Sequence, residues 1–113
     1  MSEHPALLSL QVSTEGNATV VRCRGRLTAG VTDLLKNEVK RLIPDTKRIV
    51  LDLTDLSQMD SMGLGTIASL YVSATSAGCS LELINLSKRI RELFRMTNLL
   101  TLFECVGDSV RIL

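Results

Sequence analysis

The sequence predicts an α/β fold: a single domain with a mixed, mostly parallel β-sheet covered by helices. Its 113 residues make one domain of ordinary size, and its 45% hydrophobic and 22% charged residues are typical of a globular chain. Segments with strand and helix patterns follow one another in the order β-β-α-β-α-β-α-β. Strands separated by helices pair in parallel through right-handed crossovers, so that helices cover the sheet. We expect residues 1–113 to form this one domain, with residues 1–5 as a tail.

The first half of the chain predicts a β-hairpin followed by a loop and a helix. Residues 6–12 and 18–23 have the pattern of strands, and the turn-forming residues between them favour a hairpin. Residues 25–30 are expected to form a connecting loop. A helix over residues 31–43 follows and ends at Pro44, which cannot continue it. The apolar residues at helical spacing in this helix are Val31, Leu34, Leu35, Val39, Leu42 and Ile43.

The middle of the chain predicts a strand, a loop and a second helix. The apolar strand covers residues 48–53 and runs into a short polar loop that ends at Asp60 and Ser61. A helix is expected over about residues 62–77, with Gly78 as its C-terminal cap. The residues expected on its inner face are Leu64, Ile67, Ala68, Tyr71 and Thr75.

The last part of the chain predicts two further strands and one helix. Residues 80–86 alternate and then become apolar, as in a strand. Ser87 is a suitable N-cap for a helix that continues to Thr97. Residues 101–106 are expected to form the final strand, and residues 108–109 could cap a last helical turn. The inward-facing residues of the helix are Ile90, Leu93 and Phe94.

Composition argues against several classes of partner. The 13 basic and 12 acidic residues leave a net charge of +1, so neither nucleic acid nor an anionic membrane is an expected partner. Aromatic side chains, which stack on bases, make up only 3% of the chain. The sequence has no basic and apolar signal segment and no apolar run of membrane-spanning length. We therefore expect a cytoplasmic protein.

Cysteine and histidine residues could in principle hold a metal ion. Cys23, Cys79 and Cys105 lie far apart in apolar contexts and form no CxxC spacing, and the only histidine is His4 in the tail. No metal or other cofactor is therefore expected. The cysteines are interpreted as buried free thiols.

The most informative segment is residues 51–65, LDLTDLSQMDSMGLG, because it places Ser61 at the start of a helix. A serine there can cap the helix, attack an acyl carbon or accept a phosphoryl group. As a cap, Ser61 or Asp60 would accept a hydrogen bond from the first helical turn. As a nucleophile, Ser61 lacks a glycine elbow, since Met59 occupies that place, and it lacks a histidine base outside the tail. No enzyme activity is expected.

Acceptance of a phosphoryl group fits this position better. Phosphate at a helix N-terminus meets free amides and the positive end of the helix dipole. Gly63 and Gly65 would leave the backbone near Ser61 uncovered for a docking partner, although close packing of the helix on the sheet would also explain them. A charge of about −1.5 to −2 added beside Asp60 would make a nearly neutral patch acidic and reject a partner that fits the neutral form.

The segment MDSMGLG, residues 59–65, follows a strand that ends in Asp-Leu and resembles the STAS family, named for sulphate transporters and anti-sigma factor antagonists. The resemblance continues through the next helix and through LELINLSKRIRELFRMTNLLTLFECV, so it covers nearly the whole chain. It is greatest to the stand-alone bacterial anti-sigma factor antagonists. It implies a STAS-like fold and a switch between partners.

In that family the unphosphorylated antagonist binds an anti-sigma factor, often a serine kinase, and so frees the sigma factor. The kinase phosphorylates the serine that matches Ser61 and the complex dissociates, and a PP2C-type phosphatase reverses the modification. The resemblance therefore implies that Ser61 is the phosphoacceptor. It also implies a docking surface formed by Asp60, Met62, Gly63 and Leu64.

One departure from the family pattern concerns the loop after the second strand. Many phosphorylatable members carry an acidic residue there, whereas this chain has Gly25-Arg26-Leu27-Thr28. Thr28 is expected at the partner surface, as a polar neighbour of Ser61 or as a second acceptor. A local turn or cap role would also explain it.

The resemblance leaves a second class of function open. The chain could be a non-catalytic scaffold of the stressosome kind, or the STAS partner subunit of a lipid ABC transporter. Of the two methionines beside Ser61, Met62 is expected to be exposed and to contact the partner, and the alternative is that both fill the core. Apolar side chains near the docking site would also permit a weak homodimer.

Overall fold

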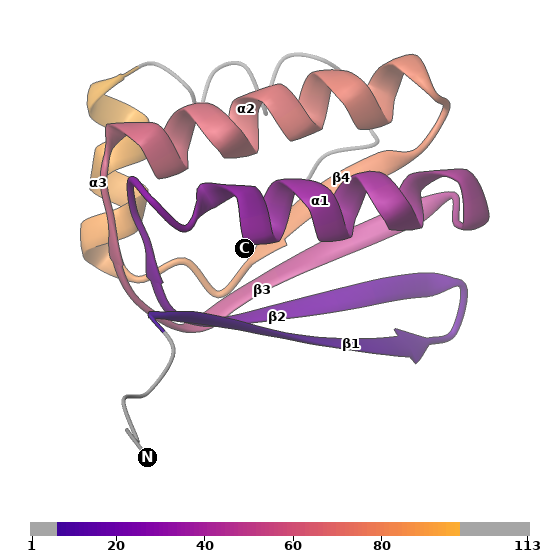
Figure 1. Cartoon of the computed structure of the whole chain (residues 1–113), viewed down its shortest axis with the longest axis horizontal. Helices are drawn as coiled ribbons and strands as arrows, with labels where there is room; N and C mark the ends of the chain where they lie inside the picture. The colour runs from indigo at the N-terminus through magenta and orange to yellow at the C-terminus, as the bar shows by residue number, and fades with distance from the viewer. Residues whose placement is uncertain (1–6, 98–113) are drawn as a thin grey trace.

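The computed structural model describes residues 7–97 of the chain. These residues form one four-stranded sheet, three α-helices and a short 3-10 helix (Figure 1). The expected order of elements is confirmed as far as the third helix, and the predicted strand at 101–106 and turn at 108–109 lie outside the described residues. In chain order the elements are β1 (Leu8–Glu15), β2 (Ala18–Leu27), α1 (Thr32–Leu42), η1 (Ile43–Asp45), β3 (Arg48–Met59), α2 (Ser61–Ser76), β4 (Ser80–Ile84) and α3 (Lys88–Met96).

The sheet is mixed and mostly parallel, as predicted. Its strands lie in the order β1-β2-β3-β4. β1 and β2 form an antiparallel hairpin, and β3 pairs in parallel with both β2 and β4. Figure 1 shows α1 and α2 side by side over one face of the sheet, with α3 at the end where α2 begins. β2 leads into α1 through residues 28–31, and β3 leads into α2 with only Asp60 between them.

The core lies between the sheet and these helices. The strands direct alternate apolar side chains toward the helices, as the pleat of a strand requires. α2 contributes buried side chains along its whole length, so the position of its first turn is determined by packing on the sheet. The largest fully buried side chains are those of Phe94, Leu27, Leu35, Ile49, Leu51, Leu53, Ile67, Leu70, Leu81, Leu83 and Val21.

Three strands extend beyond their predicted carboxyl ends. β1 continues through Glu15, so residues 13–15 of the predicted hairpin linker are strand. The extensions of β2 and β3 both run toward the start of α2. β2 continues through Leu27, so residues 25–27 of the predicted loop are strand. β3 continues through Met59, so residues 54–59 of the predicted polar loop are strand as well. The predicted ends of these two strands were wrong for two reasons. A sheet that is covered on one face keeps polar residues on its other face, so polar residues do not mark the end of a strand. Register shifts between β2 and β3 also interrupt the alternation of polar and apolar residues along the strands.

The other strand ends follow from backbone conformation. The predicted hairpin is confirmed, with Glu15 opposite Ala18 and a turn between them in which Gly16 has a φ of +63°. β4 stops at Ile84, before the end of the predicted strand. Asn85 follows with a φ of +61°, a left-handed conformation that does not continue a strand.

The first two helices agree with the predictions apart from details. Pro44 lies in η1, directly after α1, as expected of a residue that ends a helix. α2 begins at Ser61, one residue earlier than predicted. Its buried face includes Leu70 and Ala74, whereas Thr75, predicted to face inward, is exposed. The change in the buried face is a matter of how the helix is rotated on the sheet, which the local sequence does not specify.

The predicted caps of α2 and α3 are confirmed. Gly78 follows α2 with a φ of +76°, which glycine adopts without a steric penalty. The Ser87 hydroxyl accepts a hydrogen bond from the Ile90 amide at 3.2 Å and so caps α3. Ile90 and Phe94 are buried, and Leu93 packs against the core.

Two of the three cysteines are confirmed as buried free thiols. Cys23 on β2 and Cys79 before β4 are buried and unpaired. Burial, together with the nearby carboxylate of Asp52, raises the pKa of Cys23 to about 12. Burial also raises the pKa of Cys79. Cys105 lies outside the described residues.

Candidate functional site

Ser61 is the first residue of α2, and only Asp60 separates it from the end of β3. The Ser61 side chain is exposed, whereas Met59 turns into the core. In sheets with parallel strands, sites for ligands and partners form at the carboxyl ends of the strands, and Ser61 lies at that end of β3. The structure thus presents the hydroxyl group on the outside of the domain at a helix N-terminus.

Asp60 is the N-cap of α2. One of its carboxylate oxygens accepts a hydrogen bond from the Ala29 amide at 2.9 Å, and the other accepts one from the Gly63 amide at 2.9 Å. Both bonds lower the pKa of Asp60 because they stabilise its charged form, and the bond from Ala29 has the larger effect. The sequence left open whether Asp60 or Ser61 caps the helix, and the cap is Asp60. The Ser61 hydroxyl is therefore not needed for capping.

Asp60 also joins α2 to the loop between β2 and α1. Its backbone amide donates a hydrogen bond to the Leu27 carbonyl at 3.4 Å, and its carboxylate binds the Ala29 amide. Thr28, between these two residues, is half-buried, and its carbonyl accepts a hydrogen bond from the Val31 amide at 3.1 Å. The loop that contains Thr28 thus lies beside the start of α2, and Thr28 also takes part in a local turn.

Two of the residues predicted for the docking surface lie beneath it. A Cβ atom on Gly63 would stand 3.0 Å from the carbonyl carbon of Leu27 and closer still to the carbonyl oxygen, so close packing explains this glycine. Leu64 is only 3% exposed. Gly63 and Leu64 therefore lie against the sheet rather than on the exposed face of α2. Gly65, in contrast, is exposed and has open space where a Cβ would lie.

The exposed face of α2 carries no charge. No Asp, Glu, Lys or Arg occurs within this helix. Met62 and Val72 are each 57% exposed, and the small residues Gly65 and Ser69 share their face of the helix. The prediction that Met62 is exposed is confirmed. Large apolar side chains exposed among small uncharged ones are typical of a surface that another protein covers.

A hollow of about 240 Å³ opens beside Ser61. Its walls come from α2 and from one residue of α1, Lys36, because these two helices pack against each other. No sequence pattern indicated Lys36, since only the packing of α1 on α2 brings it near Ser61. The residues that line the hollow are Lys36, Ser61, Met62, Gly65, Thr66 and Ser69.

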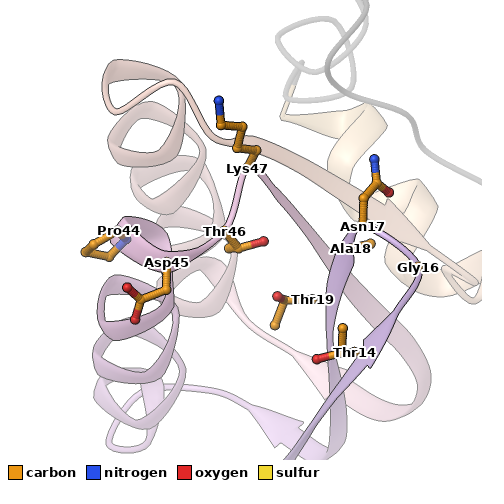
Figure 2. A pocket seen from close by; sticks show the side chains of 9 residues that line it. All are labelled: Thr14, Gly16, Asn17, Ala18, Thr19, Pro44, Asp45, Thr46 and Lys47. Atoms are coloured by element: carbon orange, nitrogen blue, oxygen red, sulfur yellow. The ribbon is translucent and has the colours of Figure 1, made fainter.

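A larger hollow, of about 530 Å³, lies at the opposite end of the parallel strands (Figure 2). It is bounded by the β1–β2 turn and by the segment that leads from η1 into β3. Figure 2 shows Thr14, Thr19 and Thr46 around its open space. Asp45 is the one carboxylate among its lining residues, which include no histidine or cysteine. The lining therefore offers polar contacts without a pair of catalytic or metal-binding groups.

Within residues 7–97, no three His, Cys, Asp or Glu side chains gather in a group that could hold a metal ion. The helices of this part of the chain are all too short or too polar to cross a membrane. His4, the one histidine of the sequence, lies outside the described residues. The chemistry at Ser61 is that of an exposed hydroxyl group on a protein surface.

Fold and site together define a small α/β domain that presents a serine at the start of a helix without charged residues. The sequence matches the family model of the STAS domain over residues 9–111, and the chain belongs to this family. It is 28% identical over 102 residues to the anti-sigma-B factor antagonist of Bacillus subtilis (strain 168). That match covers 90% of this chain and 94% of the relative.

Two solved structures of anti-sigma factor antagonists share the fold. SpoIIAA in its unphosphorylated form matches with a TM-score of 0.65 and 21% identity, over 78% of this chain and 83% of that one. An anti-sigma factor antagonist from Mycobacterium paratuberculosis matches with a TM-score of 0.76 and 18% identity, over 85% of this chain and 82% of that one. The predicted STAS-like fold and the resemblance to the stand-alone antagonists are thus confirmed.

Proposed function

We propose that this protein is an anti-sigma factor antagonist that binds an anti-sigma factor while Ser61 is unmodified and releases it when Ser61 is phosphorylated. The observation that carries the proposal is the exposed Ser61 at the first position of α2, where Asp60 already caps the helix. The similarity to the anti-sigma-B factor antagonist of Bacillus subtilis supports the same role. Binding of the anti-sigma factor would free the sigma factor.

We place the docking surface on the uncharged face of α2 and on the loop before α1. Met62 is its exposed apolar residue, and Thr28 lies in the adjoining loop. Asp60 holds this loop and the helix together through its two hydrogen bonds. Gly63 and Leu64 contribute from below, because they let the first turn of α2 lie close against the sheet.

The proposed partner is an anti-sigma factor that is also a serine kinase. It would transfer the γ-phosphoryl group of ATP to Ser61: an O–P bond forms at Oγ, the bond from the γ-phosphorus to the β,γ-bridging oxygen breaks, the hydroxyl proton is released and ADP departs. This chain is the substrate of that step. A PP2C-type phosphatase would restore the hydroxyl group by hydrolysis.

The added charge explains how the complex would be broken. A phosphoserine carries a charge of about −1.5 to −2 at neutral pH. The free amides and the dipole of α2 accommodate this charge, so the fold should persist. A partner that fits Met62 and an uncharged face would have to desolvate this charge without offering it a new contact, which weakens binding.

Intact-mass spectrometry with site localisation tests the proposal, after incubation with ATP and candidate anti-sigma kinases from the same genome. The unmutated protein should gain one phosphoryl group, and the Ser61→Ala variant should gain none. Ser69→Ala removes another exposed hydroxyl of the same helix face and should be modified like the unmutated protein. All three proteins should bind the kinase in the absence of ATP, and isothermal titration calorimetry measures this binding.

Lack of modification by every candidate kinase would refute the phosphorylation switch. Tight binding that persists in that case would favour the non-catalytic scaffold or transporter-partner role. Binding that is equal for the protein with serine and with phosphoserine at position 61 would also refute the switch.

A further inference from the structure

The hollow beside Ser61 brings a cation of one helix to the hydroxyl of another. Ser61 lies at the start of α2 and Lys36 in the middle of α1, and both line the same space of about 240 Å³. Lys36 is the one charged residue among those that line it. Building on the proposed function, we propose that Lys36 holds the phosphoryl group of phosphorylated Ser61 in this hollow.

The hollow has room for a phosphoryl group, and residues that carry hydroxyl groups are among those that line it. Its volume of about 240 Å³ leaves room for several water molecules, which a phosphoryl group could displace. Thr66 and Ser69 belong to its lining, and the hydroxyl group of Thr66 donates a hydrogen bond to the Met62 carbonyl at 2.9 Å. Ser61 is exposed and is itself one of the lining residues, so a phosphoryl group on its Oγ would be attached at this space.

Lys36 is available to a new anion. Its ammonium group forms no ion pair with a carboxylate of residues 7–97, whereas Arg41 on the same helix pairs with Glu38. Asp60, the acidic neighbour of Ser61, directs both carboxylate oxygens to backbone amides and so does not compete for Lys36. An ammonium group and a phosphate form a charge-assisted hydrogen bond, which is stronger than a bond between neutral groups.

The pairing determines how the modification affects a partner. A phosphoserine that binds Lys36 spans α1 and α2 and occupies the space beside Met62. A partner must then displace this ion pair as well as desolvate the charge. The cation also favours the dianionic form of the phosphate, so the full charge is present at neutral pH.

Phosphorus NMR of the full-length protein tests the proposal. Phosphoserine is incorporated at position 61 during translation, so the result does not depend on any kinase. The phosphate resonance is followed from about pH 4 to pH 8 in this protein and in variants that also carry Lys36→Gln, Lys36→Arg or Lys40→Gln. Lys40 lies one turn further along α1 and is exposed, and it does not line the hollow. Asp60 is unchanged in all four proteins.

We expect Lys36→Gln to raise the midpoint of the phosphate titration by about 0.5 pH unit, because loss of a nearby cation favours the monoanion. Lys36→Arg should return the midpoint to its original value, and Lys40→Gln should leave it there. Equal midpoints for Lys36→Gln and Lys40→Gln would overturn the proposal. Urea unfolding of the serine forms checks that the variants fold, and Lys36→Arg preserves the charge if Lys36→Gln does not fold.

The two proposals can fail separately. If the anti-sigma factor binds the serine and phosphoserine forms equally, the proposed function is wrong, while the midpoints still report whether Lys36 contacts the phosphate. If the midpoints are equal and binding is lost on phosphorylation, the switch stands and the role of Lys36 is wrong.

Discussion

Replacing Gly63 by alanine should destabilise the protein, although alanine is the better helix former. Gly63 lies in the first turn of α2, directly over the end of β2. An added Cβ would stand 3.0 Å from both the carbonyl carbon and the Cγ atom of Leu27, and closer still to the carbonyl oxygen. This carbonyl cannot move aside easily, because it belongs to the last residue of β2 and accepts a hydrogen bond from the Asp60 amide.

Two effects of opposite sign determine the magnitude. Alanine is favoured over glycine in a helix by about 1 kcal/mol. Overpacking of a buried site costs about 1–3 kcal/mol. The collision here is with backbone atoms rather than with a flexible side chain, so the cost should fall in the upper part of this range. We therefore expect the free energy of unfolding to fall by about 1–2 kcal/mol.

Urea unfolding followed by circular dichroism measures this change, and Gly65→Ala is the matched control. Nothing lies within 4 Å of a Cβ built on Gly65, so alanine there should raise the free energy of unfolding by about 0.5–1 kcal/mol. With an m-value of about 1–3 kcal/mol/M, the midpoints of the two variants should move in opposite directions by several tenths of a molar unit. A Gly63→Ala variant as stable as the unmutated protein would refute the reasoning.

Asp60→Asn should make the free energy of unfolding depend less on pH in the acid range. Because the pKa of Asp60 is lowered in the folded protein, its contribution is present above the unfolded pKa of about 4 and is lost as the pH falls through the folded value. Urea midpoints of the two proteins should converge in acid, and parallel curves would contradict this. Arg48→Met should lower the urea midpoint, because it removes the guanidinium that binds the 6% exposed Glu82 at 2.6 and 3.1 Å. Adding Glu82→Leu should restore most of the loss, and an unchanged midpoint in the single variant would count against the ion pair. Cys23, with a pKa raised to about 12, should resist iodoacetamide in the native protein and react in urea, and fast native labelling seen by mass spectrometry would show that the thiol is accessible.

Most elements of the fold could be predicted because their signals are local. The hairpin turn, the end of α1 at Pro44, the cap of α2 at Gly78 and that of α3 at Ser87 depend on residues only a few positions apart. The ends of β2 and β3 could not be predicted in this way. Their last residues alternate or mix polar with apolar side chains, and only pairing with each other shows that they are strands.

The candidate site shows the same division. The sequence by itself determined that a serine begins α2, that an acidic residue precedes it, and that the helix carries no charge, because these are properties of consecutive residues. The structure showed that Asp60 caps the helix through a bond from the nearby Gly63 amide, and only the tertiary structure decided that the same carboxylate also binds Ala29, from a distant part of the chain. It also decided that Gly63 packs on Leu27 and that Lys36 lines the same hollow as Ser61. The physical reason is that caps and turns depend on neighbours along the chain, whereas these contacts join residues that only the sheet and the packing of α1 on α2 bring together.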